Sequence, residues 1–564
     1  MISDNLQRVV NLNNDVSNDQ PVCKQDCSDV VNISVFFDGT GNNEDADKKE
    51  KKWSNPARLW KNANTLRDKE MADKNKKTSP NYAIYVSGVG TRFNAELNIF
   101  QRAISNFQDH YSLLGMGVGL GGARRLDYGE DQLNDALKQV LIFNAQKAEK
   151  DVKKYVGEKK NYSFAEVDKN LKDHRLIKKI NISVFGFSRG AALARAFTNQ
   201  FIGQCESNCD GLTYGQGKYP IEFKFLGIFD TVASFGLPAT NLSNSLPFLE
   251  RDLVVDERVQ NCSHYIAGNE VRFAFPVDVI HKDNKLANPN WKEVVYPGVH
   301  SDVGGGYEPD SQGVNDNFAR IPLKHMLDDA VQAGVRMYSY EELQQNFKDL
   351  FKEQFEIQPD SQKYYDAVKA ATPSQGSVQE QIKGCMKLYY SAYGTIARAG
   401  NELSVSQRVR QENKFREYIP VGPSDMATEM QRLKKLKEAT ASKKDGFNIF
   451  RVFSPVSTAY EYMISIEDWQ FESWHKDVND DIKKFYLNYV HDSKYGFLSN
   501  VEPFSYFRQR RVYESRRSAS GEERDKKAAK QKVTCSAPKQ EIPQTQFIEA
   551  YEQAQQTDNF LNAS

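Results

Sequence analysis

Short apolar runs alternate with segments of helical character along the first half of the chain. β-branched and aromatic residues dominate these runs, and glycine- or aspartate-containing turns follow several of them, which is typical of strands buried on both faces. Separation of the strands by helices predicts a mostly parallel sheet covered by helices on both sides, an α/β fold. The predicted strands are residues 31–37, 81–87, 180–185, 223–229, 271–279 and 294–296, and the predicted helices are 53–67, 130–155 and 191–197.

The pattern changes after about residue 335. Residues 339–450 are helix-rich and charged without obvious strands, and residues 451–513 are rich in aromatic side chains. We therefore predict four parts, which are a polar N-terminal segment at 1–29, an α/β domain at 30–335, a helix- and aromatic-rich accessory region at 336–513, and a basic flexible or surface tail at 514–564.

Composition excludes several classes of protein. The 75 basic and 75 acidic residues give a formal net charge of zero, so there is no global electrostatic case for a nucleic-acid partner. The first ten residues lack the basic and apolar regions of a signal peptide, and no window approaches 18 apolar residues. We expect synthesis in the cytoplasm, and export only by a route that reads no such signal.

Seven cysteines are an odd number for so long a chain, which does not indicate a disulfide scaffold. Cys23 and Cys27 share a C-x-x-x-C spacing with Cys205 and Cys209. Free thiols are the default expectation, with a local disulfide or a four-thiolate zinc site as alternatives. We expect no metal and no cofactor.

The pentapeptide Gly186-Phe187-Ser188-Arg189-Gly190 is a G-x-S-x-G motif. An apolar run precedes it and an alanine-rich run follows it, so the motif joins a predicted strand to a predicted helix, the context of a nucleophile elbow. Side chains at Gly186 and Gly190 would crowd this tight turn, in which the serine is held in a strained conformation. The alternative is a chance match, but the flanking elements favour Ser188 as a nucleophile.

A serine nucleophile needs a histidine base and an acid that orients the histidine, and with this elbow the acid and then the histidine follow the serine in the chain. His300 lies directly after a predicted strand and before a glycine run, so we expect it to be the base. A structural role in a turn is the alternative reading of His300. His264 and His281 are alternative bases.

Asp230 ends the strand at 223–229 and falls between the serine and the histidine. We expect it to be the acid, although an aspartate at this place can also cap the following turn. Asp302 is the competing candidate, but it follows His300 too closely for the usual order and fits a role in shaping the loop better.

The oxyanion formed during acyl transfer requires hydrogen-bond donors. One is expected to be the backbone N–H of Arg189, the residue after the nucleophile. The other is expected from Gly39 and Thr40, because their glycine-rich loop follows an early strand and lets backbone amides approach a carbonyl closely. The glycine-rich run at 115–122 has no strand directly before it and is interpreted as a mobile loop or lid.

Five motifs together resemble the α/β-hydrolase phospholipase effectors of bacterial type VI secretion, in which they occur in the same order. The resemblance covers residues 30–310 and implies an α/β-hydrolase fold with a Ser188–Asp230–His300 triad that cleaves acyl esters of glycerophospholipids. The motifs are the strand and turn at 31–43, Gly88-Val-Gly-Thr91, Phe185-Gly-Phe-Ser-Arg-Gly-Ala191, Gly227-Ile-Phe-Asp-Thr-Val232 and Pro297-Gly-Val-His-Ser-Asp-Val-Gly-Gly-Gly306.

The resemblance also implies partners and a destination. These are the phospholipid membrane surface, a cognate immunity protein, a secretion spike or carrier protein, and delivery into the envelope of rival cells. Members of the family carry extra helical segments that engage membranes, and residues 336–513 are the candidate here. An α/β-hydrolase acting on a different ester or amide, and a non-catalytic interaction protein that keeps the fold, remain the alternative functions.

Membrane contact needs apolar or basic side chains. Aromatic residues of 451–513 and apolar residues of 113–122 are candidates for insertion at the headgroup boundary. A basic cluster is a candidate for contact with anionic lipid. The alternative readings are an ordinary core for the aromatics and a solvated face for the cluster, which consists of Arg508, Arg510, Arg511, Arg516 and Arg517.

Overall fold

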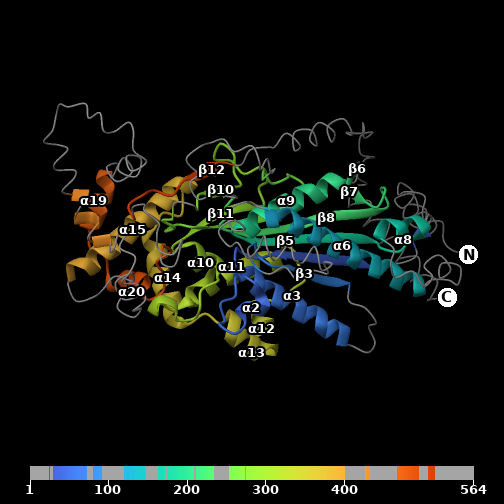
Figure 1. Cartoon of the computed structure of the whole chain (residues 1–564), viewed down its shortest axis with the longest axis horizontal. Coiled ribbons are helices and arrows are strands. Elements are labelled where there is room, and N and C mark those ends of the chain that lie inside the picture. Colours follow the sequence, from blue (N-terminus) through green and yellow to red (C-terminus); the bar gives the residue numbers. More distant parts are fainter. Residues whose placement is uncertain are drawn as a thin grey trace, which may run out of the picture.

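An eight-stranded sheet runs through the centre of the molecule in the computed structural model (Figure 1). The structure describes residues 24–25, 29–72, 80–89, 91, 120–147, 163–171, 174–208, 211–233, 253–272, 275–399, 426–427, 429–431, 433–434, 467–494 and 506–514.

The main path of the sheet is wholly parallel. Its strands follow one another in the order β11 (Trp291–Tyr296), β9 (Val259–Ala267), β8 (Tyr219–Phe229), β5 (Lys179–Phe187), β2 (Val30–Phe37) and β3 (Asn81–Val86). β7 (Gly211–Tyr214) pairs antiparallel with β8, and β6 (Glu206–Asn208) with β7. Two small ladders lie apart, β1 (Lys24–Gln25) with β4 (His174–Arg175), and β10 (Val277–Val279) with β12 (Val512–Glu514).

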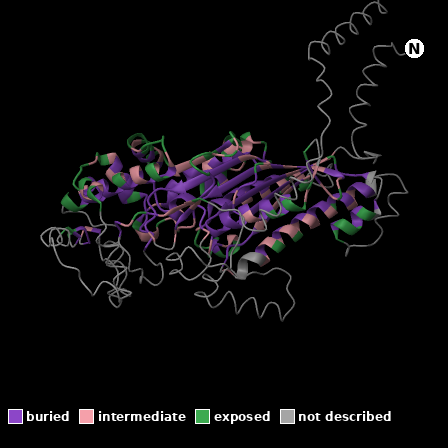
Figure 2. Ribbon diagram, turned by 90° about the horizontal axis from the view of Figure 1, so that it is seen from above, coloured by how far each residue is buried: buried purple, intermediate pink, exposed green. Residues whose placement is uncertain are grey.

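Successive side chains of a strand point to opposite faces, and β2 shows how this divides the core. Phe36 packs with α3 (Asn55–Ala72) and α11 (Arg320–Gln332) on one face, whereas Val35 and Phe37 pack with α6 (Leu120–Lys147) and α9 (Arg189–Gln204) on the other. The strands are accordingly buried along most of their length (Figure 2). The predicted α/β fold with helices on both faces of a parallel sheet is confirmed.

The helices that follow residue 335 lie partly at one end of the molecule and partly near its middle (Figure 1). Their apolar side chains join the same core cluster as α3 and α11. They are α12 (Tyr340–Asn346), α13 (Lys348–Leu350), η5 (Phe351–Phe355), α14 (Pro359–Ala371), α15 (Val378–Ala399), α19 (Asp468–Trp474) and α20 (Asp480–Asn488). The shorter elements of the first half are α2 (Glu44–Asp47), α8 (Phe164–Asn170), α10 (His300–Gly304), η3 (Ser311–Gly313) and η4 (Asp316–Ala319).

Several aromatic side chains of residues 451–513 lie in the core of the protein. Trp474, Phe485, Tyr486 and Tyr489 are buried in the core cluster, so these side chains have the ordinary core role rather than a role at the membrane. Phe497 and other aromatic residues of 451–513 lie outside the described residues. Within the described part of the chain, no helix is long and apolar enough to cross a membrane.

One predicted strand and one predicted helix have other bounds in the structure, and a further strand was not predicted. The strand expected at 271–279 is limited to 277–279, and the neighbour of β8 is β9 at 259–267 instead. β9 was missed because Gln260, Asn261 and Ser263 interrupt its apolar pattern. The helix expected at 130–155 is α6, which begins at Leu120 and takes in the end of the presumed lid; residues 115–119 lie outside the described residues.

Candidate active site

The G-x-S-x-G motif forms a sharp strand-to-helix turn. β5 ends at Phe187, α9 begins at Arg189, and Ser188 between them has φ 60° and ψ −126°. A non-glycine residue with positive φ is costly and marks functional sites when it is held by its surroundings. Backbone hydrogen bonds hold Ser188 here, since its N–H donates to Phe229 O at 3.0 Å and its carbonyl accepts from the amide of Ala191 at 3.1 Å.

The two motif glycines are required by close backbone contacts. A Cβ at Gly186 would lie 2.4 Å from the carbonyl oxygen of Gly190. A Cβ at Gly190 would lie 2.3 Å from Asp38 O and 2.5 Å from Phe37 O. Gly186 therefore lets α9 start close to the end of β5, and Gly190 lets α9 approach the loop after β2.

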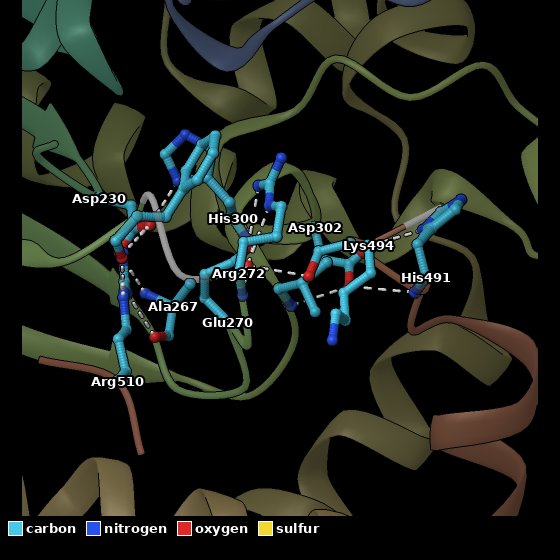
Figure 3. A network of polar contacts seen from close by, with 12 residues as sticks. Asp230, Ala267, Glu270, Arg272, His300, Asp302, His491, Lys494 and Arg510 are labelled. Carbon is cyan, nitrogen blue, oxygen red and sulfur yellow. Dashed lines mark hydrogen bonds and ion pairs between the residues drawn. The ribbon is translucent and has the colours of Figure 1, made fainter. Parts of the chain in front are cut away.

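Asp230 and His300 meet beside this turn. Asp230 directly follows β8, the neighbour of β5, and also has a positive φ of 43°. His300 is the first residue of α10, and its Nδ1 lies 2.5 Å from Asp230 Oδ2 (Figure 3). Both side chains are buried, so the pair is shielded from water.

The electrostatics of the pair suit a neutral base. Burial lowers the pKa of His300 below its usual value, although the hydrogen bond that His300 donates to Asp230 acts in the opposite direction. Burial would raise the pKa of the Asp230 carboxyl, but the Arg510 guanidinium and His300 outweigh it, so the pKa is held well below its usual range. Asp230 is therefore ionised and accepts a hydrogen bond from the Nδ1–H of a neutral His300, which leaves a lone pair on Nε2.

Nε2 of His300 is buried and has no hydrogen-bond partner within the described residues. No hydrogen bond joins it to Ser188, so the expected contact of about 2.6–3.2 Å is not present in the structure. The two residues are nevertheless neighbours through Phe187, whose ring lies 4.6 Å from the His300 ring. A Cβ at Gly304 would lie 2.0 Å from the Phe187 ring, so the glycine run after His300 lets α10 pack directly on the elbow.

The loop expected to supply oxyanion donors lies beside the elbow. Thr40 Oγ1 accepts a hydrogen bond from Arg189 Nε at 2.5 Å. The amide of Gly39 is already used, because it donates to Asp38 Oδ1 at 2.7 Å. The Thr40 amide has no hydrogen-bond partner among the described residues, so it is the donor of this loop that could contact an oxyanion.

Asp38 itself has an unusual environment. Ser54 Oγ and Tyr85 Oη both donate hydrogen bonds to its carboxyl group. Burial raises the pKa of Asp38 to about 6 despite these bonds. This network ties the loop after β2 to β3 and α3.

The alternative candidates for the acid and the base contact other residues. Asp302 Oδ1 lies 2.6 Å from His491 Nδ1, and its Oδ2 accepts from the Val299 amide at 3.0 Å, so it shapes the loop before His300 and joins it to the C-terminal region. His264 and His281 both contact Glu293 rather than Asp230. Nε2 of His264 accepts the Thr231 amide at 3.2 Å, which leaves that histidine no free lone pair.

Arg510 is a site residue that the sequence did not reveal. Its guanidinium donates to both carboxylate oxygens of Asp230, at 2.7 Å each, across 280 residues of chain (Figure 3). The expectation that Arg510 faces lipid or solvent is wrong, because the side chain is buried. Neither motif nor spacing distinguishes this arginine from the neighbouring basic residues.

The structure describes only some of the cysteines that were considered for a disulfide or a zinc site. Among the described residues no group of three or more histidine, cysteine or acidic side chains is arranged to hold a metal ion. Cys205 is a free thiol, as are Cys262 and Cys385. Cys23, Cys27 and Cys209 lie outside the described residues.

Comparison with known proteins identifies the region that holds the Asp230–His300 pair. Residues 207–329 match the catalytic domain of the family described as type VI secretion phospholipase effectors, Tle1-like. The chain carries a Tle1-like phospholipase effector catalytic domain. The matched part of the Tle1-like domain contains Asp230 and His300 and begins after Ser188. No curated protein sequence matches the chain.

The chain is also similar to solved structures. An uncharacterized protein from Pseudomonas aeruginosa superposes with a TM-score of 0.56 at 21% identity, over 91% of this chain and 82% of the other. A Tle1 effector, solved bound to the VgrG spike of the type 6 secretion system, matches with a TM-score of 0.33 at 20% identity, over 65% of this chain and 84% of its own. The first likeness supports the α/β architecture of the chain.

Proposed function

We propose that the Tle1-like domain is a serine esterase of phospholipase A type, with Ser188 as nucleophile, His300 as base and Asp230 as the orienting acid. The observation that carries the proposal is the strained serine at the strand-to-helix turn, with the buried Asp230–His300 pair at the end of the next strand. A serine at a strained turn and an aspartate–histidine pair beside it are the groups that nucleophilic catalysis by a triad requires.

The geometry supports the following reaction. Ser188 attacks the acyl carbonyl of the lipid while Nε2 of His300 accepts the hydroxyl proton. The amides of Arg189 and Thr40 stabilise the oxyanion, and Asp230 stabilises the imidazolium. His300 then protonates the departing lysophospholipid oxygen, and water cleaves the acyl-enzyme by the same steps in reverse order.

The substrate and the biological setting follow from the family. Phospholipase effectors of type VI secretion act on lipids, so we propose glycerophospholipid acyl esters at a membrane surface as the substrate. We further propose carriage by a secretion spike, delivery into the envelope of target cells, and a cognate immunity protein in the producing cell. Residues 30–335 are proposed as the catalytic domain and 336–513 as the accessory region, with part of the latter contributing to the site.

A fluorophosphonate probe tests the nucleophile without any assumption about the lipid. The native protein should be labelled at Ser188, as located by peptide mass, and Ser188→Ala should not be labelled. Ser183 is a matched control, because it lies buried in the same strand but outside the turn, so Ser183→Ala should keep the label. Labelling that survives in a folded Ser188→Ala protein would exclude Ser188 as the nucleophile.

A further inference from the structure

Arg510 binds the acid of the proposed triad more extensively than any other side chain. Nη1 and Nη2 each lie 2.7 Å from one oxygen of Asp230, a bidentate arrangement. Nη1 also donates to Ala267 O, and Nε donates to Phe275 O, both at 2.8 Å. These bonds fix the guanidinium to the last residue of β9 and to the segment between β9 and β10, and thereby fix the carboxylate plane.

The bidentate contact with Arg510 determines which carboxylate oxygen of Asp230 faces His300. Oδ1 accepts from Arg510 and from the Ala267 amide at 2.9 Å, whereas Oδ2 accepts from Arg510 and from His300. Rotation of the carboxylate would break both arginine bonds together. Arg510 therefore holds Oδ2 toward Nδ1 of the imidazole.

Residues 506–514, which we call the C-terminal strap, bring Arg510 to this place. At one end of the strap, Tyr390 Oη donates to Tyr506 O at 3.1 Å, and the Tyr390 and Phe507 rings stack at 4.8 Å. At the other end, β12 pairs with β10, and the Val277 amide donates to Arg511 O at 3.0 Å. The strap thus connects the C-terminal helices to a loop of the catalytic domain.

We propose that Arg510 is a positioning residue for the triad, and that the C-terminal strap makes catalysis depend on docking of the C-terminal helical region. The proposal rests on the proposed esterase function. The Arg510 guanidinium lies on the side of Asp230 away from His300, where it orients the carboxylate and partly neutralises its negative charge. An imidazolium at His300 is then less stabilised than it would be beside an unshared carboxylate.

Several charged groups face His300 and must be considered together. Asp230 and Arg510 lie on its Nδ1 side, and Glu270 accepts the His300 backbone amide at 3.2 Å while pairing with Arg272. Each carboxylate thus has its own arginine. Removing Arg510 alone leaves one negative charge uncompensated, which favours the protonated imidazole.

The test is the pH dependence of kcat/KM with a soluble ester substrate for the full-length protein and its variants. The acidic limb reports protonation of His300, which is inactive when charged. In the native protein this limb should lie below the ordinary histidine value of about 6.5, since burial lowers the pKa of His300. Arg510→Gln should move the limb to higher pH and lower kcat by about tenfold or more.

Arg510→Lys separates charge from orientation. Lysine keeps the positive charge but cannot make the bidentate contact with Asp230. The acidic limb should therefore stay near its native pH while kcat falls. Arg511→Gln is the matched control in the same strap, because the Arg511 guanidinium donates to Tyr513 Oη at 3.4 Å and not to Asp230, and this change should leave both quantities unchanged.

The following results would overturn the positioning role of Arg510. If Arg510→Gln and Arg510→Lys lose kcat equally and neither limb moves, or if both variants fail to fold, Arg510 serves packing and the proposal is wrong. Native activity in Arg510→Gln would also overturn it. An inactive native protein that no fluorophosphonate labels would instead refute the esterase function itself, so the two failures are distinguishable.

Discussion

Two residues of the site have backbone conformations that side chains disfavour. Ser188 and Asp230 both have positive φ, and they lie at the ends of adjacent parallel strands. Such conformations cost about 1–3 kcal/mol each and persist only where surrounding structure imposes them. The Phe229 carbonyl bonds to the Ser188 amide, so the two turns constrain one another.

Replacement of the two candidate acids should distinguish their roles. Asp230→Asn should lower kcat by roughly ten-thousandfold, because the imidazole loses its orienting acceptor. Asp302→Asn should have a much smaller effect on kcat and instead lower the free energy of unfolding by about 1–3 kcal/mol, because it weakens the buried bond to His491. Steady-state kinetics together with urea unfolding of both variants measures this difference. A greater loss of kcat in a folded Asp302→Asn protein would reverse the assignment.

At the scale of elements, the strands and the elbow were predictable because their signals are local. β2, β3, β5 and β8 are apolar runs, and the order of the motifs places Ser188, Asp230 and His300 after strands. β9 was not predictable, because its polar side chains bond to neighbouring elements, as Ser263 Oγ does to Asp329 at 2.8 Å. A pattern of hydrophobicity cannot anticipate such partners.

The elbow depends on close approach of α9 to the loop after β2. Gly190→Ala should abolish activity and destabilise the protein by more than 1 kcal/mol, since the added methyl group would collide with backbone oxygens at 2.3 and 2.5 Å. Gly203→Ala is the control, because Gly203 is exposed in the last turn of the same helix and alanine there should stabilise by up to about 1 kcal/mol. Thermal unfolding and fluorophosphonate labelling measure both effects. Equal labelling of Gly190→Ala and the native protein would show that the elbow tolerates a side chain.

At the scale of the whole molecule, the C-terminal helices share a core with the sheet. Phe185 and Phe225 of the sheet belong to the same buried cluster as Tyr390 and Phe485 of the helices. The expected division at residues 335 and 513 marks a change in composition and does not mark a break in the core. Arg510 could not be assigned from the sequence for the same reason, since its partner is reached only through this packing.

Phe485→Ala tests whether the helices and the sheet unfold together. The ring is fully buried and packs edge to face on Phe318 at 5.0 Å, so its loss should cost about 3–5 kcal/mol. Unfolding should remain a single transition, with loss of activity at the same denaturant concentration as loss of helical signal. Two separated transitions would show that the C-terminal helices are an independent unit.

The central claim is that Ser188 cleaves acyl esters of phospholipids, and product identification tests it most directly. Purified protein is incubated with vesicles of a defined diacyl phospholipid whose two acyl chains differ in mass, and the products are identified by mass spectrometry. The account predicts one free fatty acid and the matching lysophospholipid, with turnover reduced roughly a millionfold in Ser188→Ala. Release of the headgroup instead, or equal product from the native protein and Ser188→Ala, would contradict it.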